Sequence, residues 1–205
     1  MTSMYAIPRL LVVTLTVSVC CGTASCAKPL AEKEYYDNGQ IAIERTIRNG
    51  KMHGIVRTYH RNGVLWGEAT YVNGKMDGLT TLYYPNGTVK TEVSYQRDLL
   101  HGRRREYRPD GKLKGEGMYV NGVEEGIWTV YGVDGRRWEY PHKNGKKHGI
   151  AKMYNPTSEY VTHTTFRDGV EEKTFRMYDA QGNLIYEGES NANPGDEFLE
   201  FQSQY

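Results

Sequence analysis

Histidines at one recurring position are the first residues in this sequence whose spacing suggests metal chemistry. The position holds His53, His101 and His148, and in the copies between them it holds Asp77, Glu125 and Glu172. If each copy forms two antiparallel strands, neighbouring copies of this position lie about 9.5 Å apart. Zinc ligands lie about 2 Å from their metal. We therefore expect these side chains to serve turns, and we predict no metal site.

Recurring carboxylates are the second candidate for chemistry. Glu68, Glu92 and Glu116 follow one another at intervals of 24 residues. The same strand spacing makes them a poor catalytic pair, whose carboxyl groups must lie about 5 to 9.5 Å apart. The sequence holds no Gly-x-Ser-x-Gly motif and no phosphate-binding loop. Because a catalytic group is needed once and these groups recur, we predict that the protein is not an enzyme and has no catalytic or cofactor-binding residues.

Four arginines form the strongest local charge. Arg103, Arg104, Arg105 and Arg108 stand close together, but the formal net charge of the chain is only +1. Such a balance predicts no long-range attraction to nucleic acid or to an anionic membrane. We expect a solvated strand face here and no nucleic-acid partner, with contact to a phosphate or an acidic partner as the alternative.

The elements that position these residues come from a repeat. A tyrosine stands four residues before a glycine, and the pattern recurs every 24 residues with one step of 23. Its members are Tyr35 and Gly39, Tyr59 and Gly63, Tyr83 and Gly87, Tyr107 and Gly111, Tyr131 and Gly135, Tyr154 with Ser158 in the glycine position, and Tyr178 and Gly182. A second glycine recurs in step, at Gly54, Gly78, Gly102, Gly126 and Gly149. We interpret these residues as structural and repeat-defining.

Each copy alternates strands with tight turns. The run Gly63–Val72 alternates with period two and is rich in β-branched and aromatic residues, which is typical of a strand. Pairs such as Asn49-Gly50 and Asn62-Gly63 supply the positive φ that tight hairpin turns need. The fold class that follows is all-β. We expect an elongated antiparallel meander of repeated β-hairpins in a single sheet, with about 24 residues per repeat and about thirteen strands.

The repeated tyrosines are expected to stack along one face of this sheet. We interpret them as its core, and an aromatic binding surface is the alternative. Glycines at positions 67, 115, 117 and 188 are expected to leave room for the tyrosine rings.

The repeat resembles a known family. The segments Asn49–Gly54, Asn73–Gly78 and Asn144–Gly149, alternating with Tyr-x-x-Asn/Asp-Gly, resemble the MORN repeat in its bacterial variant form. Proteins of this type are often labelled YwqK-family antitoxin-like. The resemblance extends over residues 35–189 and implies a scaffold or a binding surface without a common chemistry.

The start of the chain resembles an export signal. Leu10–Val19 is an apolar run of about ten residues, too short to span a bilayer and typical of a secretory signal. Thr23–Cys26 resembles a lipoprotein cleavage motif, which would place a lipid on Cys26. Cleavage after Ala27 is the alternative, and a retained membrane anchor is the third. We predict a signal peptide over residues 1–27, a short linker over 28–34, the repeat domain over 35–189, and a C-terminal cap or tail over 190–205.

The sequence leaves three candidate functions. The first is an exported, non-catalytic scaffold at the cell envelope that binds an unidentified protein partner, with a membrane tether if Cys26 carries a lipid. The protein would then lie in the periplasm or envelope, or be secreted. The second is an antitoxin or immunity-like protein, and the third is a surface that binds phospholipid or glycan.

Overall fold

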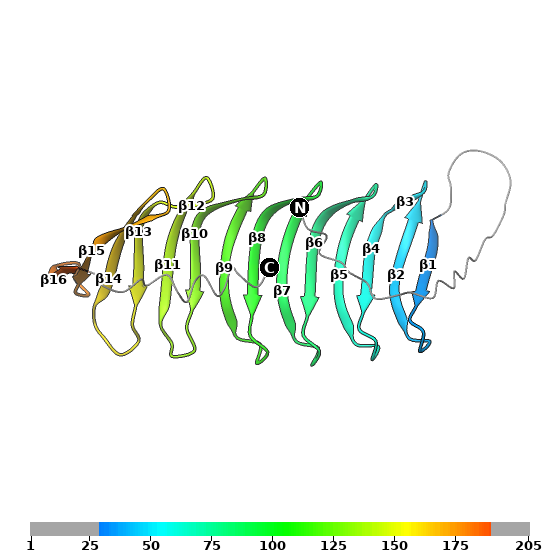
Figure 1. The fold of residues 1–205 in the computed structure, drawn as a ribbon, viewed down its shortest axis with the longest axis horizontal. Helices are drawn as coiled ribbons and strands as arrows, with labels where there is room; N and C mark the ends of the chain where they lie inside the picture. The colour runs from blue at the N-terminus through cyan, green and yellow to red at the C-terminus, as the bar shows by residue number, and fades with distance from the viewer. Residues whose placement is uncertain (1–28, 190–205) are drawn as a thin grey trace. The chain divides into compact units, whose positions relative to one another are not determined.

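Regular structure in this protein is β throughout the part of the chain that is described. The computed structural model describes residues 29–189, and each element in that range is a β-strand (Figure 1). Between residues 29 and 189 there is no helix with the length and apolar character of a membrane span. Neighbouring strands in this range pair antiparallel, for example β4 with β5 and β14 with β15. The prediction of an all-β antiparallel hairpin meander is confirmed.

Contacts divide the chain into two compact units. The first contains residues up to Leu100 and Tyr107–Gly111, and the second contains His101–Glu106 and the residues from Lys112 onward. The strands of the first unit are β1 (Leu30–Tyr35), β2 (Ile41–Arg48), β3 (Lys51–Met52), β4 (Gly54–Tyr59), β5 (Leu65–Val72), β6 (Lys75–Tyr83) and β7 (Val89–Gln96). The strands of the second are β9 (Leu113–Val120), β10 (Val123–Tyr131), β11 (Arg137–Lys143), β12 (Lys146–Lys147), β13 (Gly149–Tyr154), β14 (Val161–Arg167), β15 (Val170–Tyr178) and β16 (Leu184–Glu189). Strand β8 (Leu99–Tyr107) contributes residues to both units.

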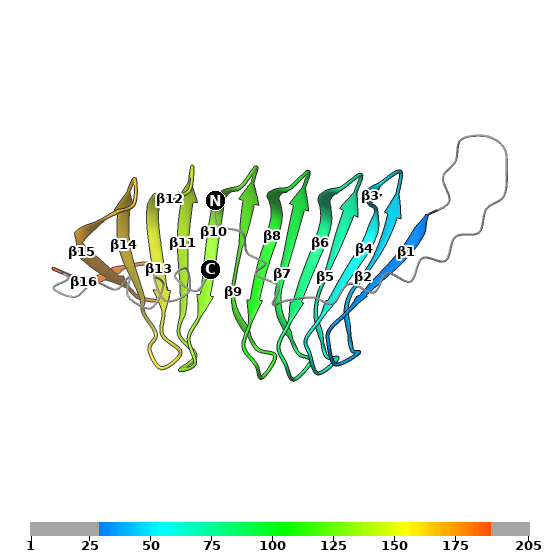
Figure 2. The same ribbon diagram turned by 45° about the vertical axis from the view of Figure 1, so that its right-hand side comes forward.

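Two kinds of turn alternate within each unit, at opposite ends of its strands (Figures 1 and 2). At one end, Asn49 and Gly50 both have positive φ, 53° and 72°, as in a type I′ turn. At the other end, Gly39 has a φ of 81°, and its amide donates to the Tyr36 oxygen at 3.0 Å. The Tyr36 amide in turn donates to the Gln40 oxygen at 2.8 Å, which closes a three-residue loop. The Asn-Gly pairs therefore build two different turns.

The second repeated glycine lies inside a strand and not in a turn. Gly78 has a φ of 124° within β6, and the register of β5 against β6 shifts between Ala69 and Tyr71. This is a β-bulge, and its positive φ strongly favours glycine. At the corresponding place the strand breaks at His53, between β3 and β4, and at His148, between β12 and β13.

The two faces of the sheet carry different side chains. The first, which we call the charged face, bears a row of paired polar residues: Lys33, Glu44, Arg57, Glu68, Thr81 and Glu92 in the first unit, and Glu116, Thr129, Glu139, Lys152, His163, Arg176 and Glu187 in the second. The other, which we call the groove face, bears Val56, Ala69, Thr80 and Val93 in the first unit, and Trp128, Tyr140, Ala151 and Thr164 in the second. Most of the buried side chains lie on the groove face, where Trp128 is only 1% exposed.

The expectation that the repeated tyrosines form the core is wrong. Tyr59 and its equivalents are half-buried, and the buried rings are Tyr119, Trp128, Tyr140 and Phe166. The repeated tyrosines lie at strand ends, as Tyr59 does next to a register shift. There the Tyr59 hydroxyl donates to Glu44 on the charged face.

The expectation for the strand glycines is also wrong in its detail. A Cβ on Gly117 would overlap the indole of Trp128, a Cβ on Gly67 would lie 2.8 Å from Leu82 Cδ2, and a Cβ on Gly188 would lie 2.6 Å from Tyr186 Cε1. These glycines therefore make room for other side chains than the repeated tyrosines.

The predicted linker over residues 28–34 is wrong from residue 30 onward. Leu30–Tyr35 forms β1 and pairs with β2, with Leu30 opposite Ile47. Because this segment is rich in charged residues, its sequence does not indicate a strand. In the structure these residues pair with residues of β2: Glu32 with Arg45 at 3.0 Å and Lys33 with Glu44 at 2.6 Å. The predictions for residues 1–27 and 190–205 lie outside the described residues.

Candidate binding groove

A groove opens on the groove face of the second unit. It is lined by Trp138, Tyr140, Ala151, Lys152, Met153, Thr162, Thr164, Phe166, Glu171 and Phe175, and its volume is about 230 Å³. These residues come from β11, β13, β14 and β15. The lining is therefore aromatic and apolar with few polar groups, which is the usual character of a binding site.

The hollow arises from small residues between large ones. Ala151 stands directly opposite Thr164, and Thr164 stands opposite Phe175. The groove is therefore lined by small side chains of β13 and β14 together with the rings of Trp138, Tyr140, Phe166 and Phe175. Tyr140 and Phe166 meet edge to face with their centroids 6.2 Å apart, which fixes one wall.

A carboxylate, Glu171, stands at this groove. It lies on β15 opposite Phe166, and its Oε1 atom is buried without a hydrogen-bond partner. Burial raises the pKa of Glu171, and the charge of Lys147 acts in the opposite direction. A buried acceptor without a donor is uncommon in proteins and calls for an explanation.

Lys147 is the cation beside the groove. Its Nζ lies 4.2 Å from the centroid of Tyr140 and 5.0 Å from that of Phe166. Burial lowers the pKa of Lys147, whereas Glu171 and Glu124 raise it. The aromatic wall thus already holds one ammonium group against its rings.

Buried polar side chains continue from the groove toward β8. Arg104 pairs with Glu106, which is 2% exposed, and Arg104 Nη1 donates to the Tyr119 hydroxyl at 3.4 Å. The Tyr119 hydroxyl donates to Glu124 Oε1 at 3.2 Å. Glu124 Oε2 lies 3.5 Å from Nε2 of His142. We call these five residues the polar row.

Burial shifts the pKa of three members of the polar row, Tyr119, Glu124 and His142. Burial raises the pKa of Glu124 and the pKa of Tyr119, and burial lowers the pKa of His142. His142 Nδ1 lies 3.0 Å from the Tyr140 oxygen, and a carbonyl only accepts, so Nδ1 carries the hydrogen. In the neutral ring Nε2 is then an acceptor facing Glu124, and a proton between Nε2 and the carboxylate would satisfy both groups.

One repeat position explains why these charges gather in the second unit. The position is apolar in the first three copies, Met52, Met76 and Leu100, and charged in the last three, Glu124, Lys147 and Glu171. His142 likewise stands where other copies have Tyr71, Tyr95, Tyr119 and Phe166. We did not single out these residues from the sequence, although this change of residue type within a repeat position was visible there.

The arginine cluster is divided between the two faces. Arg103 and Arg105 pair with Glu116 on the charged face, at 3.6 and 3.3 Å, whereas Arg104 is part-buried beside Glu106. The expectation of a solvated strand face is therefore wrong for Arg104, because alternation along β8 turns it to the groove face.

The repeated tyrosines and glutamates are paired on the charged face. The hydroxyl of Tyr59 donates to Glu44 at 2.8 Å, and that of Tyr107 to Glu92 at 2.8 Å. Burial, together with the bond to Glu44, raises the pKa of Tyr59 to about 12. Glu68, Glu92 and Glu116 are thus structural partners in this arrangement.

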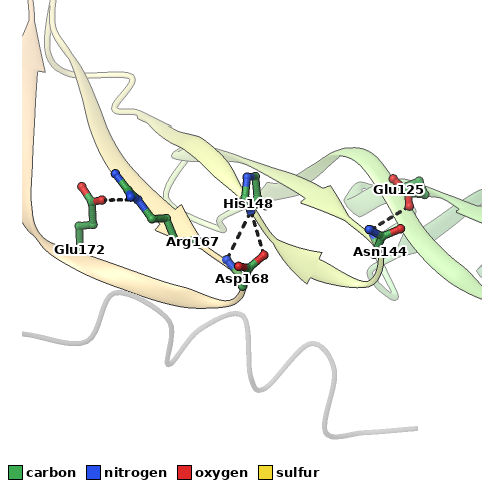
Figure 3. Close-up of polar contacts among 6 residues, drawn as sticks. All are labelled: Glu125, Asn144, His148, Arg167, Asp168 and Glu172. Atoms are coloured by element: carbon green, nitrogen blue, oxygen red, sulfur yellow. Dashed lines mark hydrogen bonds and ion pairs between the residues drawn. The ribbon is translucent and has the colours of Figure 1, made fainter.

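At the histidine position, the side chains of His101, Glu125 and His148 contact turns, as expected for these three residues. Glu125 accepts from the Asn144 amide at 2.8 Å, and His148 Nδ1 lies 3.1 Å from Asp168 Oδ1 and accepts from the Asp168 amide at 3.4 Å (Figure 3). Each of these side chains binds the turn of the next copy. Within residues 29–189 no group of three or more His, Cys, Asp or Glu side chains is arranged to hold a metal. Cys26, the predicted lipidation site, lies outside the described residues.

Comparison with known proteins identifies the repeat. A family model described as the MORN repeat variant matches four successive segments: residues 30–49, 52–73, 76–97 and 100–121. No curated protein matches the chain. The hairpins continue beyond residue 121 through β16. Residues 30–121 therefore carry four tandem copies of the MORN repeat variant.

Proposed function

We propose that this protein is an exported, non-catalytic scaffold at the cell envelope that binds a protein partner through the groove face of its second unit. The observation that carries the proposal is the groove formed by Trp138, Tyr140, Phe166 and Phe175. Aromatic residues and Met are enriched in the cores of protein interfaces, and Met153 lines the same groove.

The size of the groove favours a protein partner over a small molecule. Pockets for drug-sized ligands measure about 300–1,000 Å³, and this groove measures about 230 Å³. It has room for a single side chain or a similar group. Repeat proteins commonly bind partners along such extended surfaces.

The charged face is less suited to this role because its charges are paired within the protein. Lys33 pairs with Glu44 at 2.6 Å, Arg57 with Glu68 at 2.6 Å, and Arg176 with Glu187 at 3.3 Å. Each pair would have to be broken or desolvated by a partner that binds there. Recognition is therefore assigned to the groove face.

Site-specific photocrosslinking tests this assignment. A benzophenone amino acid replaces Thr162, which lines the groove, or Thr165, which stands opposite Ile150 on the charged face of the same strand. In the native host, we expect a discrete crosslinked protein from position 162 and none from position 165. Equal crosslinking at both positions, or none at either, contradicts the proposal.

Export is tested by the intact mass of the mature protein. An acylated chain that begins at Cys26 supports a membrane-tethered protein, and a chain that begins at Lys28 supports simple secretion. A mature protein that keeps Met1–Ala27 and remains in the cytoplasm contradicts export.

A further inference from the structure

We propose that the groove receives an arginine side chain of the partner protein, with its guanidinium group at Glu171. This inference rests on the proposed function and specifies the chemistry of the same site. It is carried by the carboxylate, by the aromatic walls, by the size of the groove and by the residues of the repeat position to which Glu171 belongs.

The first argument is the carboxylate of Glu171, which lacks a hydrogen-bond donor. Glu171 Oε1 is buried without a hydrogen-bond donor in the protein, and Glu171 lines the groove. A guanidinium carries five N–H donors and pairs well with a carboxylate. An arriving arginine therefore satisfies a group that the protein itself leaves unsatisfied.

The walls suit a planar cation. Trp138 and Phe175 line the groove and are half-buried, and Trp is the ring on which cations bind best. Arginine stacks on aromatic faces and is more weakly hydrated than lysine, so it enters a partly dry groove with less loss of hydration. Lys147 shows that a cation is held by this wall, because its Nζ lies over Tyr140 and Phe166.

Two lysines must be considered because they repel an incoming cation. Lys152 lines the groove, but its paired neighbours are Glu139 and His163 on the charged face. Lys147 remains as the competing cation, and its charge also acts on Glu171. Removing the charge of Lys147 should therefore strengthen the binding of arginine.

The repeat supplies substitutions that fit the fold. Glu171 and Lys147 occupy the position that holds Met52 and Met76 in the first two copies. Glu171→Met and Lys147→Met thus install the residue that the repeat already uses there. Glu171→Gln keeps the shape of the side chain, and Glu172→Gln is its matched control, because Glu172 is the next residue and pairs with Arg167 at 3.1 Å (Figure 3).

The test is a titration of the mature full-length protein followed by nuclear magnetic resonance. The probes are N-acetyl-arginine N-methylamide, its neutral isostere N-acetyl-citrulline N-methylamide, and choline. For the arginine probe we expect a dissociation constant on the order of 1 mM, because a single side chain offers few contacts. The shifts should include the indole N–H of Trp138, and the citrulline probe should bind at least about tenfold more weakly.

The variants decide between the possible outcomes. We expect Glu171→Gln and Glu171→Met to weaken arginine binding about tenfold or more, Glu172→Gln to leave it unchanged, and Lys147→Met to strengthen it several-fold. Choline binding more tightly than the arginine probe would overturn the inference in favour of a small-molecule ammonium. No binding of the arginine probe, or equal weakening by Glu171→Gln and Glu172→Gln, would also overturn it. If photocrosslinking from position 162 succeeds while the arginine probe fails, this inference fails alone and the proposed function stands.

Discussion

Arg104 and Glu106 lie two residues apart on β8 and form an ion pair on the groove face, with Glu106 only 2% exposed. In the preceding copy the same two positions hold Thr80 and Leu82. The pair therefore replaces the uncharged residues of the preceding copy, although β1 also holds charged residues at these positions, Glu32 and Glu34. Such a pair is weak evidence for stability, because desolvation offsets much of the attraction.

The first prediction concerns this pair. Glu106→Leu removes the carboxylate that pairs with the part-buried Arg104 and should lower the free energy of unfolding by about 3 kcal/mol. The double change Arg104→Thr with Glu106→Leu reproduces the preceding copy and should return the stability to within about 1 kcal/mol of the natural protein. Urea denaturation followed by circular dichroism measures both. A double variant as unstable as Glu106→Leu alone would show that the pair itself is required.

The second prediction concerns Gly117 and Trp128. A Cβ on Gly117 would overlap the indole of Trp128, so Gly117→Ala should destabilise the protein by about 1–3 kcal/mol. The equivalent pair in the second copy is Ala69 opposite Thr80. Combining Gly117→Ala with Trp128→Thr should therefore cost less than the sum of the two single changes, by about 1 kcal/mol or more. Additive costs in a double-mutant cycle would mean that the two residues do not compete for space.

The third prediction concerns the turn at Arg97 and Asp98. Both have positive φ, 51° and 72°, where the equivalent turn has Asn73 at 53° and Gly74 at 84°. Asparagine adopts this conformation more readily than arginine. Arg97→Asn should therefore raise the free energy of unfolding by about 0.5–1 kcal/mol, and Asn73→Arg should lower it by a similar amount. Thermal melts of the two variants check this, and changes of the same sign would contradict it.

The fourth prediction concerns pH and His142. Burial lowers the pKa of His142 below its usual 6.5. The imidazole of His142 therefore binds a proton less readily in the folded protein than in the unfolded chain. The contribution of this neutral ring to stability is present above pH 6.5 and is lost as pH falls through and below that value. His142→Tyr, which installs the residue found at Tyr119, should reduce the loss of stability between pH 7 and pH 5.

Melting temperatures measured across this pH range test the fourth prediction. Phe166→Tyr is the matched control, because Phe166 occupies the same repeat position and carries no titrating imidazole. The control should keep the natural dependence on pH. If His142→Tyr keeps it as well, another group is responsible for the loss.

Much of the fold follows from residues that act locally. Asn49-Gly50 and Gly39 adopt positive φ by their own chemistry, and the period-two pattern of Gly63–Val72 specifies a strand without help from distant parts of the chain. The repeat interval then gives the order of the hairpins. What the turn residues do not reveal is the bulge at Gly78, because a glycine with positive φ fits a turn and a bulge equally well.

The sequence by itself determined the repeated hairpins, their turns and the alternation of the two faces, since these depend on φ preferences and on neighbours along the chain. Only the tertiary structure decided which face is buried and which charges it encloses. Arg104, Glu124 and Glu171 are ordinary charged residues in the sequence, but register across the strands places them on the groove face. The groove exists because Ala151 and Thr164 lie between rings from other strands. The groove depends on side chains that are far apart in the chain, so no local sequence pattern predicts it.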